Sequence, residues 1–123
     1  MNLKKIYQIR LPGQHFYEIF FPILFIIIGL FGAFNHALWR DEMQGWLVAW
    51  QSDSLIDLWK NNAPSGHPVL WSLLIYFSKN ITGTPISMQL MHWFLGSSAI
   101  LIFWKFSPFN LTTKALFTFG YFP

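Results

Sequence analysis

The feature that most constrains the fold is a run of 20 residues without a charged side chain, IFFPILFIIIGLFGAFNHAL, from Ile19 to Leu38. A helix rises about 1.5 Å per residue, so roughly 20 residues cross the ~30 Å hydrocarbon core of a bilayer. A signal peptide would have an apolar region of about 7–15 residues, and no small-x-small cleavage site lies near Asn35. We therefore expect an uncleaved transmembrane helix over residues 16–38.

Composition supports a membrane protein. Only 11% of the 123 residues are charged and 54% are hydrophobic, whereas soluble domains have about 25% charged residues. The net charge of +3 is small, and nothing in the sequence indicates a nucleic-acid partner. The absence of cysteine excludes disulfides, thiolate metal sites and thiol nucleophiles.

A second apolar run, Met88 to Trp104, predicts another crossing over residues 87–105. The run from Pro68 to Ile81 is short for a crossing and suits an interfacial or re-entrant segment. With that segment kept on the outside, the positive-inside rule places two groups of basic residues together in the cytoplasm. These residues are Lys4, Lys5, Arg10, Lys105 and Lys114.

The predicted fold class is therefore all-α, a polytopic integral membrane protein with a cytoplasmic N-terminus. Its expected segments are a cytoplasmic stretch (1–15), a crossing (16–38), an outer loop with juxtamembrane helices (39–86), a crossing (87–105), a cytoplasmic loop (106–114) and the start of a third crossing (115–123). The last apolar run has only nine residues, and unfinished helices do not end at membrane depth. We expect the chain to be the N-terminal part of a longer protein.

The outer loop opens with WRDEMQGWLVAW, in which Asp41 and Glu42 directly follow the first crossing. Asp41 suits the N-cap of a helix, with Gln44 three residues later completing a capping box. Glu42 in the first turn would suit the helix dipole. The alternative is that one carboxylate acts as a general base or binds a metal ion. The sequence leaves both interpretations open.

Apolar spacing predicts how this helix lies. Met43, Trp46, Leu47 and Trp50 follow one helical face, and tryptophan favours the membrane interface, so we expect the helix to lie along the membrane surface. After it, Ser54 and Asp57 have the spacing of an N-cap pair and predict a second short helix. NNAPSGHP then reads as a loop.

Three polar residues near these segments have less specific interpretations. Gln89 and His92, one turn apart in the second crossing, are expected to face the bundle interior or to bond a neighbouring helix. His36 has no evident partner in the sequence.

In this order, the crossing, WRDE, the interfacial helix, GHPVLW and the second crossing resemble the start of the GT-C glycosyltransferases. The nearest pattern is that of the protein O-mannosyltransferase and aminoarabinose-transferase group. Asp41–Glu42 matches the acidic motif of that superfamily in place and type. GHPVLW (Gly66 to Trp71) stands where those families have a Pro-Pro-Leu-aromatic turn, with Pro68 matching the second proline and His67 replacing the first.

The resemblance implies transfer of a sugar from a polyprenyl-phosphate donor to an acceptor on the outer or lumenal face of a membrane, of the bacterial inner-membrane type. Asp41 would be the catalytic base, with Glu42 assisting, while Arg40 and His67 would contact the donor phosphate. No cofactor is expected, and a role for a divalent metal ion stays open. The implied partners are the lipid bilayer and the lipid-linked sugar.

Two alternatives belong to other functional classes. A polytopic transporter or flippase also carries acidic residues, although typically near the membrane midplane. A membrane subunit without catalysis would need no carboxylate chemistry at all. We expect the later outer loops to discriminate, since a second acidic motif beside a basic residue favours a transferase.

Overall fold

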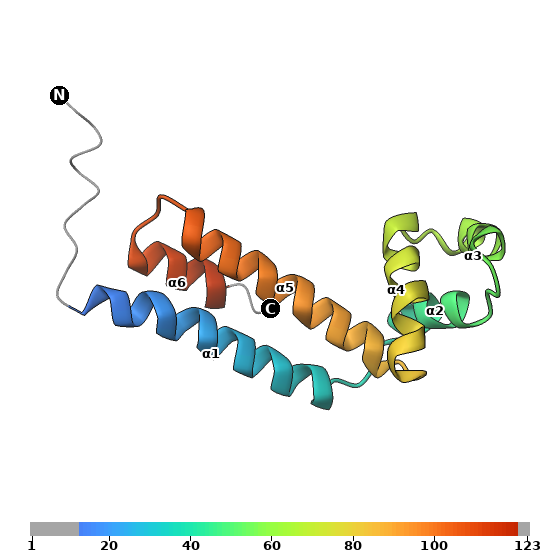
Figure 1. The fold of residues 1–123 in the computed structure, drawn as a ribbon, viewed down its shortest axis with the longest axis horizontal. Coiled ribbons are helices and arrows are strands. Elements are labelled where there is room, and N and C mark those ends of the chain that lie inside the picture. Colours follow the sequence, from blue (N-terminus) through green and yellow to red (C-terminus); the bar gives the residue numbers. More distant parts are fainter. Residues whose placement is uncertain (1–12, 121–123) are drawn as a thin grey trace, which may run out of the picture. The chain divides into compact units, whose positions relative to one another are not determined.

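A computed structural model of the chain describes residues 13–120, and these are helical apart from short connections (Figure 1). Its elements are α1 (Gln14–Asn35), α2 (Arg40–Trp50), α3 (Leu55–Asn62), the 3-10 turn η2 (Ala63–Ser65), α4 (Val69–Thr82), α5 (Ile86–Phe106) and α6 (Leu111–Phe119). No strand occurs within residues 13–120. The all-α prediction is confirmed.

Two helices are long and apolar enough to cross a membrane, as judged by length and composition: α1 with 22 residues and α5 with 21. Only 6% of the apolar window of α1 and 22% of that of α5 are buried. A core helix of a soluble protein would be mostly buried, so both helices offer their apolar surface to a surrounding medium. They correspond to the predicted segments 16–38 and 87–105.

Helix ends differ from the predicted segments at two places. The helix α1 ends at Asn35, whose side chain donates a hydrogen bond to the Phe31 carbonyl, and residues 36–39 form a non-helical link. The predicted loop 106–114 is shorter, because α6 begins at Leu111. Most of the predicted cytoplasmic stretch (1–15) and the last three residues of segment 115–123 lie outside the described residues.

The chain divides into two units, and one of them comprises residues 30–94. In this unit α2 and α3 both pack against α4, around a core of buried apolar side chains. The core residues are Trp46, Ala49, Leu58, Ile75 and Met88. With its 14 residues α4 is about 21 Å long, too short to cross a bilayer core.

The predicted apolar stripe on α2 is only partly covered by the rest of the protein, although the rings of Trp46 and Trp50 stack on each other. Trp46 is buried in the core, whereas Leu47 and Trp50 are exposed. The reason is that α4 packs on the side of α2 that carries Gly45, Trp46 and Ala49. Spacing therefore predicted the helix correctly but not which of its apolar residues would be covered.

The C-terminal end of α2 is fixed by two side chains of α4. The Lys79 ammonium donates to the carbonyls of Ala49 (2.9 Å) and Ser52 (2.7 Å), and lies 4.3 Å from the centre of the Tyr76 ring. The Tyr76 hydroxyl donates to the Asp53 carbonyl at 3.1 Å. A cation at a helix C-terminus also interacts favourably with the helix dipole. Both ends of α2 are thus held by side chains.

The next helix begins as the sequence predicted. The Ser54 hydroxyl accepts a hydrogen bond from the Asp57 amide and donates one to the Asp57 carboxylate. These contacts satisfy an amide at the start of α3 that has no partner within the helix. The predicted N-cap pair is confirmed.

The second unit comprises residues 13–29 and 95–120 of the described chain. Phe21 of α1 packs against the rings of Trp104 in α5 and Phe119 in α6. The Lys114 ammonium is buried and donates to the Trp104 carbonyl, while the Trp104 indole donates to the Thr118 hydroxyl. A lysine of α6 thus bonds a carbonyl near the end of α5, just as a lysine of α4 bonds carbonyls at the end of α2.

Candidate functional site

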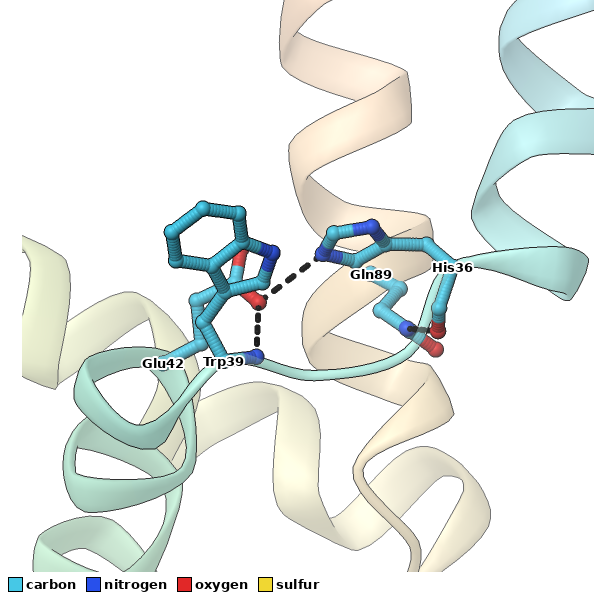
Figure 2. A network of polar contacts seen from close by, with 4 residues as sticks. All are labelled: His36, Trp39, Glu42 and Gln89. Carbon is cyan, nitrogen blue, oxygen red and sulfur yellow. Dashed lines mark hydrogen bonds and ion pairs between the residues drawn. The ribbon is translucent and has the colours of Figure 1, made fainter.

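The acidic pair lies in the first turn of α2, and Glu42 rather than Asp41 closes the start of this helix. Trp39 is the N-cap residue, and its amide donates a 2.9 Å hydrogen bond to Oε2 of Glu42 (Figure 2). The predicted N-cap at Asp41 with Gln44 is therefore wrong. The helix begins at Arg40, so the glutamate reaches back from the third helical position, as in a capping box.

Glu42 also bonds His36, for which the sequence offered no partner. Nε2 of His36 lies 2.9 Å from the same oxygen, Oε2 of Glu42 (Figure 2). An ionised carboxylate only accepts hydrogen bonds, so the imidazole N–H is the donor in this pair. Gln89 of α5 donates to the His36 carbonyl at 2.9 Å, so its partner lies in the non-helical link and not on a neighbouring helix as one interpretation predicted.

The surroundings of Glu42 favour its charged form. Partial burial acts to raise the pKa of Glu42 above its ordinary value of 4.5. The Trp39 amide, the hydrogen bond with His36 and the positive charges of His36 and His92 act in the opposite direction, and the net result is a lowered pKa. Glu42 is thus an ionised carboxylate at neutral pH, with one oxygen, Oε2, engaged in hydrogen bonds. It is poorly suited to take up a proton.

Asp41 differs from Glu42 in its exposure and in its hydrogen bonding. Its side chain is exposed, and within the described residues it makes no hydrogen bond or ion pair. Neighbouring side chains on a helix point about 100° apart, so the carboxylates face different directions. The capping function that was one interpretation of Asp41 belongs to Glu42. Asp41 is therefore the carboxylate of this pair that stays exposed to the surroundings.

Arg40 is the first residue of α2, and it too is exposed without an ion pair in the part of the chain that the structure describes. A cation at a helix N-terminus opposes the helix dipole, at a cost of about 0.3–1 kcal/mol. Its position therefore does not contribute to the stability of α2. A negatively charged ligand beside the first turn of α2 would offset this unfavourable interaction between Arg40 and the helix dipole.

His67 lies in the turn before α4, and the backbone of that turn is tightly bonded. Asn62 donates to the His67 carbonyl (3.0 Å), the His67 amide donates to Ser65, and Ser72 donates to the Asn62 side chain. The imidazole Nε2, however, is buried without a hydrogen-bond partner. Such groups are rare in native proteins, because leaving one unpaired costs about 1–3 kcal/mol. The ring would have to turn outward to meet a ligand.

The structure brings together three of the four predicted site residues. Arg40, Asp41 and Glu42 share one helical turn, whereas no hydrogen bond or ion pair within residues 13–120 joins His67 to them. Nor do three or more His, Asp or Glu side chains of the described residues form a group suited to hold a metal ion. Sequence reasoning missed His36, since its spacing to Glu42 matches no helical or capping pattern.

Comparisons with protein-family models, with curated proteins and with solved structures found no match to this chain. Any role for these residues must therefore be argued from their chemistry and their geometry.

The lowered pKa of Glu42 predicts a pH-dependent contribution to stability. A carboxylate with a depressed pKa stabilises the fold above its ordinary pKa of 4.5, and this contribution is lost as the pH falls through the folded-state pKa. We expect wild type to lose stability relative to Glu42→Gln between about pH 5.5 and pH 3.5. The difference should stay below about 1 kcal/mol, because the ion pair with His36 is exposed. Thermal unfolding of the two purified proteins across this range measures it, and parallel pH profiles would contradict the assignment.

Proposed function

We propose that the protein is a membrane glycosyltransferase of the GT-C type, which transfers a sugar from a polyprenyl-phosphate donor to an acceptor hydroxyl at the outer face of the membrane. The observation that carries the proposal is the difference between the two adjacent carboxylates. Glu42 caps α2 and pairs with His36, whereas Asp41 is exposed and unbonded within the described residues. A free carboxylate on a fixed helical turn is what a general base requires.

In the proposed reaction the acceptor oxygen attacks the anomeric carbon of the donor. The bond from that carbon to the phosphate oxygen breaks, and its electron pair leaves with the lipid phosphate. Asp41 takes the proton of the acceptor hydroxyl as the new bond forms, which general-base catalysis makes about 10²–10⁴-fold faster. Glu42 stays ionised and holds the turn in place.

Two basic residues serve the donor in this proposal. Arg40 provides an exposed guanidinium beside Asp41, and guanidinium groups bind phosphate through paired hydrogen bonds. His67 would contribute its imidazole after the ring turns out of its unpaired, buried position. The phosphate-binding role is better supported for Arg40 than for His67, because Arg40 shares a helical turn with Asp41.

The membrane arrangement is also part of the proposal. The helices α1 and α5 cross the bilayer, α6 begins a third crossing, and α2, α3 and α4 lie in the outer loop of a multi-pass protein with a cytoplasmic N-terminus, as in a bacterial inner membrane. Trp39, Trp50 and Trp59 are all more than half exposed. Tryptophans of this kind suit the interfacial layer, where the ring is partly in lipid and partly in water.

The position of the acidic residues favours an enzyme over a transporter. Transporters place carboxylates near the middle of crossing helices. The only acidic residue in the two long helices is Glu18, which is close to the start of α1. Asp41 and Glu42 lie instead on α2, beyond the end of α1.

Asp41→Asn is the variant that tests the proposed base. Because Asp41 makes no cap hydrogen bond, the amide should change stability by no more than about 0.3–1 kcal/mol, its contribution to the helix dipole. Loss of the base should slow transfer about 10²–10⁴-fold. The measurement is sugar transfer from a polyprenyl-phosphate donor in membranes that contain the protein expressed from its complete reading frame.

Asp53→Asn is the matched control, since Asp53 is an exposed carboxylate of the same loop. It should transfer at the wild-type rate. Glu42→Gln should be mildly impaired, because glutamine can still accept the Trp39 hydrogen bond. Near-normal transfer by Asp41→Asn would remove Asp41 as the base, and an inactive Glu42→Gln beside it would assign the reaction to Glu42.

Cysteine labelling tests the proposed topology. The 123 residues contain no cysteine, so within them each introduced cysteine is the single thiol, and any cysteines elsewhere in the complete reading frame are first replaced by serine. Cysteines at Ala63 and Thr84, which are exposed before and after α4, should both react with an impermeant thiol reagent added outside intact cells. A cysteine at Thr112 in α6 should be protected. Labelling at Ala63 with protection at Thr84 would mean that α4 crosses the membrane, which its 14 residues argue against.

A further inference from the structure

The link between α1 and α2, residues 36–39, depends on a small number of side-chain contacts. The Trp39 amide bonds Glu42, the His36 imidazole bonds the same Glu42 oxygen, and Gln89 holds the His36 carbonyl (Figure 2). A non-helical segment has no regular backbone hydrogen bonds, so such contacts decide its conformation. His36 takes part in two of the three, one through its side chain and one through its backbone.

The shared oxygen makes the two contacts of Glu42 interdependent. Oε2 of Glu42 accepts a hydrogen bond from the Trp39 amide at 2.9 Å, and it lies 2.9 Å from Nε2 of His36. The imidazole therefore restricts rotation of the carboxylate that closes the first turn of α2. Asp41 lies in that turn, one position before Glu42, so the backbone position from which its side chain extends depends on the same turn.

We propose that His36 is a positioning residue, which holds Glu42 in its capping position and thereby fixes the backbone turn that carries the Asp41 carboxylate. This role rests on the proposed function, because it matters to the reaction only if Asp41 is the base. His36 itself would touch neither the donor nor the acceptor. Gln89 supports it by tying its backbone to α5.

Stability alone does not account for the pair. The side chains of His36 and Glu42 are 41% and 38% exposed, and exposed ion pairs contribute little to folding. Restricting a turn is a different effect, because a displacement of about 1 Å in a reacting group can lower a rate about 100-fold. We therefore expect loss of the pair to affect turnover much more than thermal stability.

The test uses two variants of His36 and a matched control. His36→Leu removes the imidazole, while His36→Gln keeps an N–H donor at a similar distance from the backbone. His15→Leu is the control, because His15 is another exposed histidine, 81% exposed and 4.0 Å from Glu18. All proteins are expressed from the complete reading frame. Each is assayed for sugar transfer and for hydrogen–deuterium exchange of residues 39–43.

Two measurements on the single variants support the proposal together. His36→Leu should lower kcat about 10- to 100-fold with an unchanged KM, and amide exchange at Trp39 should become about tenfold faster, the equivalent of one net hydrogen bond. His36→Gln should restore most of both properties, and His15→Leu should match wild type.

A double variant tests whether His36 acts through Asp41. In the Asp41→Asn background, His36→Leu should cause no further loss of transfer, because residues that act as a unit are not additive. Full additivity of the two losses would overturn the positioning role.

Different failures point to different errors. Unchanged exchange at Trp39 in His36→Leu would show that the imidazole does not hold the turn. Faster exchange with wild-type kcat would overturn the positioning role, while an inactive Asp41→Asn would keep the proposed function intact. A wild-type protein without any transfer activity would reject the proposed function and this role with it.

Discussion

The arrangement at the start of α2 depends on the hydrogen bonds that one oxygen of Glu42 accepts. Oε2 accepts hydrogen bonds from the Trp39 amide and the His36 imidazole, and these bonds join the link after α1 to the first turn of α2. The neighbouring Asp41 carboxylate has no partner among the described residues. A helix start needs only a few such acceptors for its free amides. Because Glu42 provides one of them, Asp41 is not needed as a cap.

The same principle governs other helix ends in the chain. Lys79 binds carbonyls at the end of α2, and Lys114 binds the Trp104 carbonyl at the end of α5. Neither lysine forms a salt bridge within the described residues, and both interact with backbone carbonyls instead. Side chains thus bond both ends of α2, the helix that carries the candidate site: Glu42 at its start and Lys79 at its end.

Sequence patterns predicted the helices well but not their contacts. The long apolar runs and the short run from Pro68 to Ile81 located the main elements to within a few residues, since helix length and proline act locally. Which side of α2 is covered was not predictable, because Trp46 and Leu47 are both apolar and the position of α4 decides between them. The His36–Glu42 pair spans a non-helical link, for which no periodic signal exists.

Carbodiimide labelling of carboxylates, followed by peptide mass mapping of the purified protein, tests most directly whether the two adjacent acids differ as described. Asp53, an exposed carboxylate in the same loop, is the reference. We expect Asp41 to be labelled as fast as Asp53, and Glu42 to be labelled much more slowly because its oxygen is engaged by Trp39 and His36. Equal labelling of the two acids, or faster labelling of Glu42, would contradict the account.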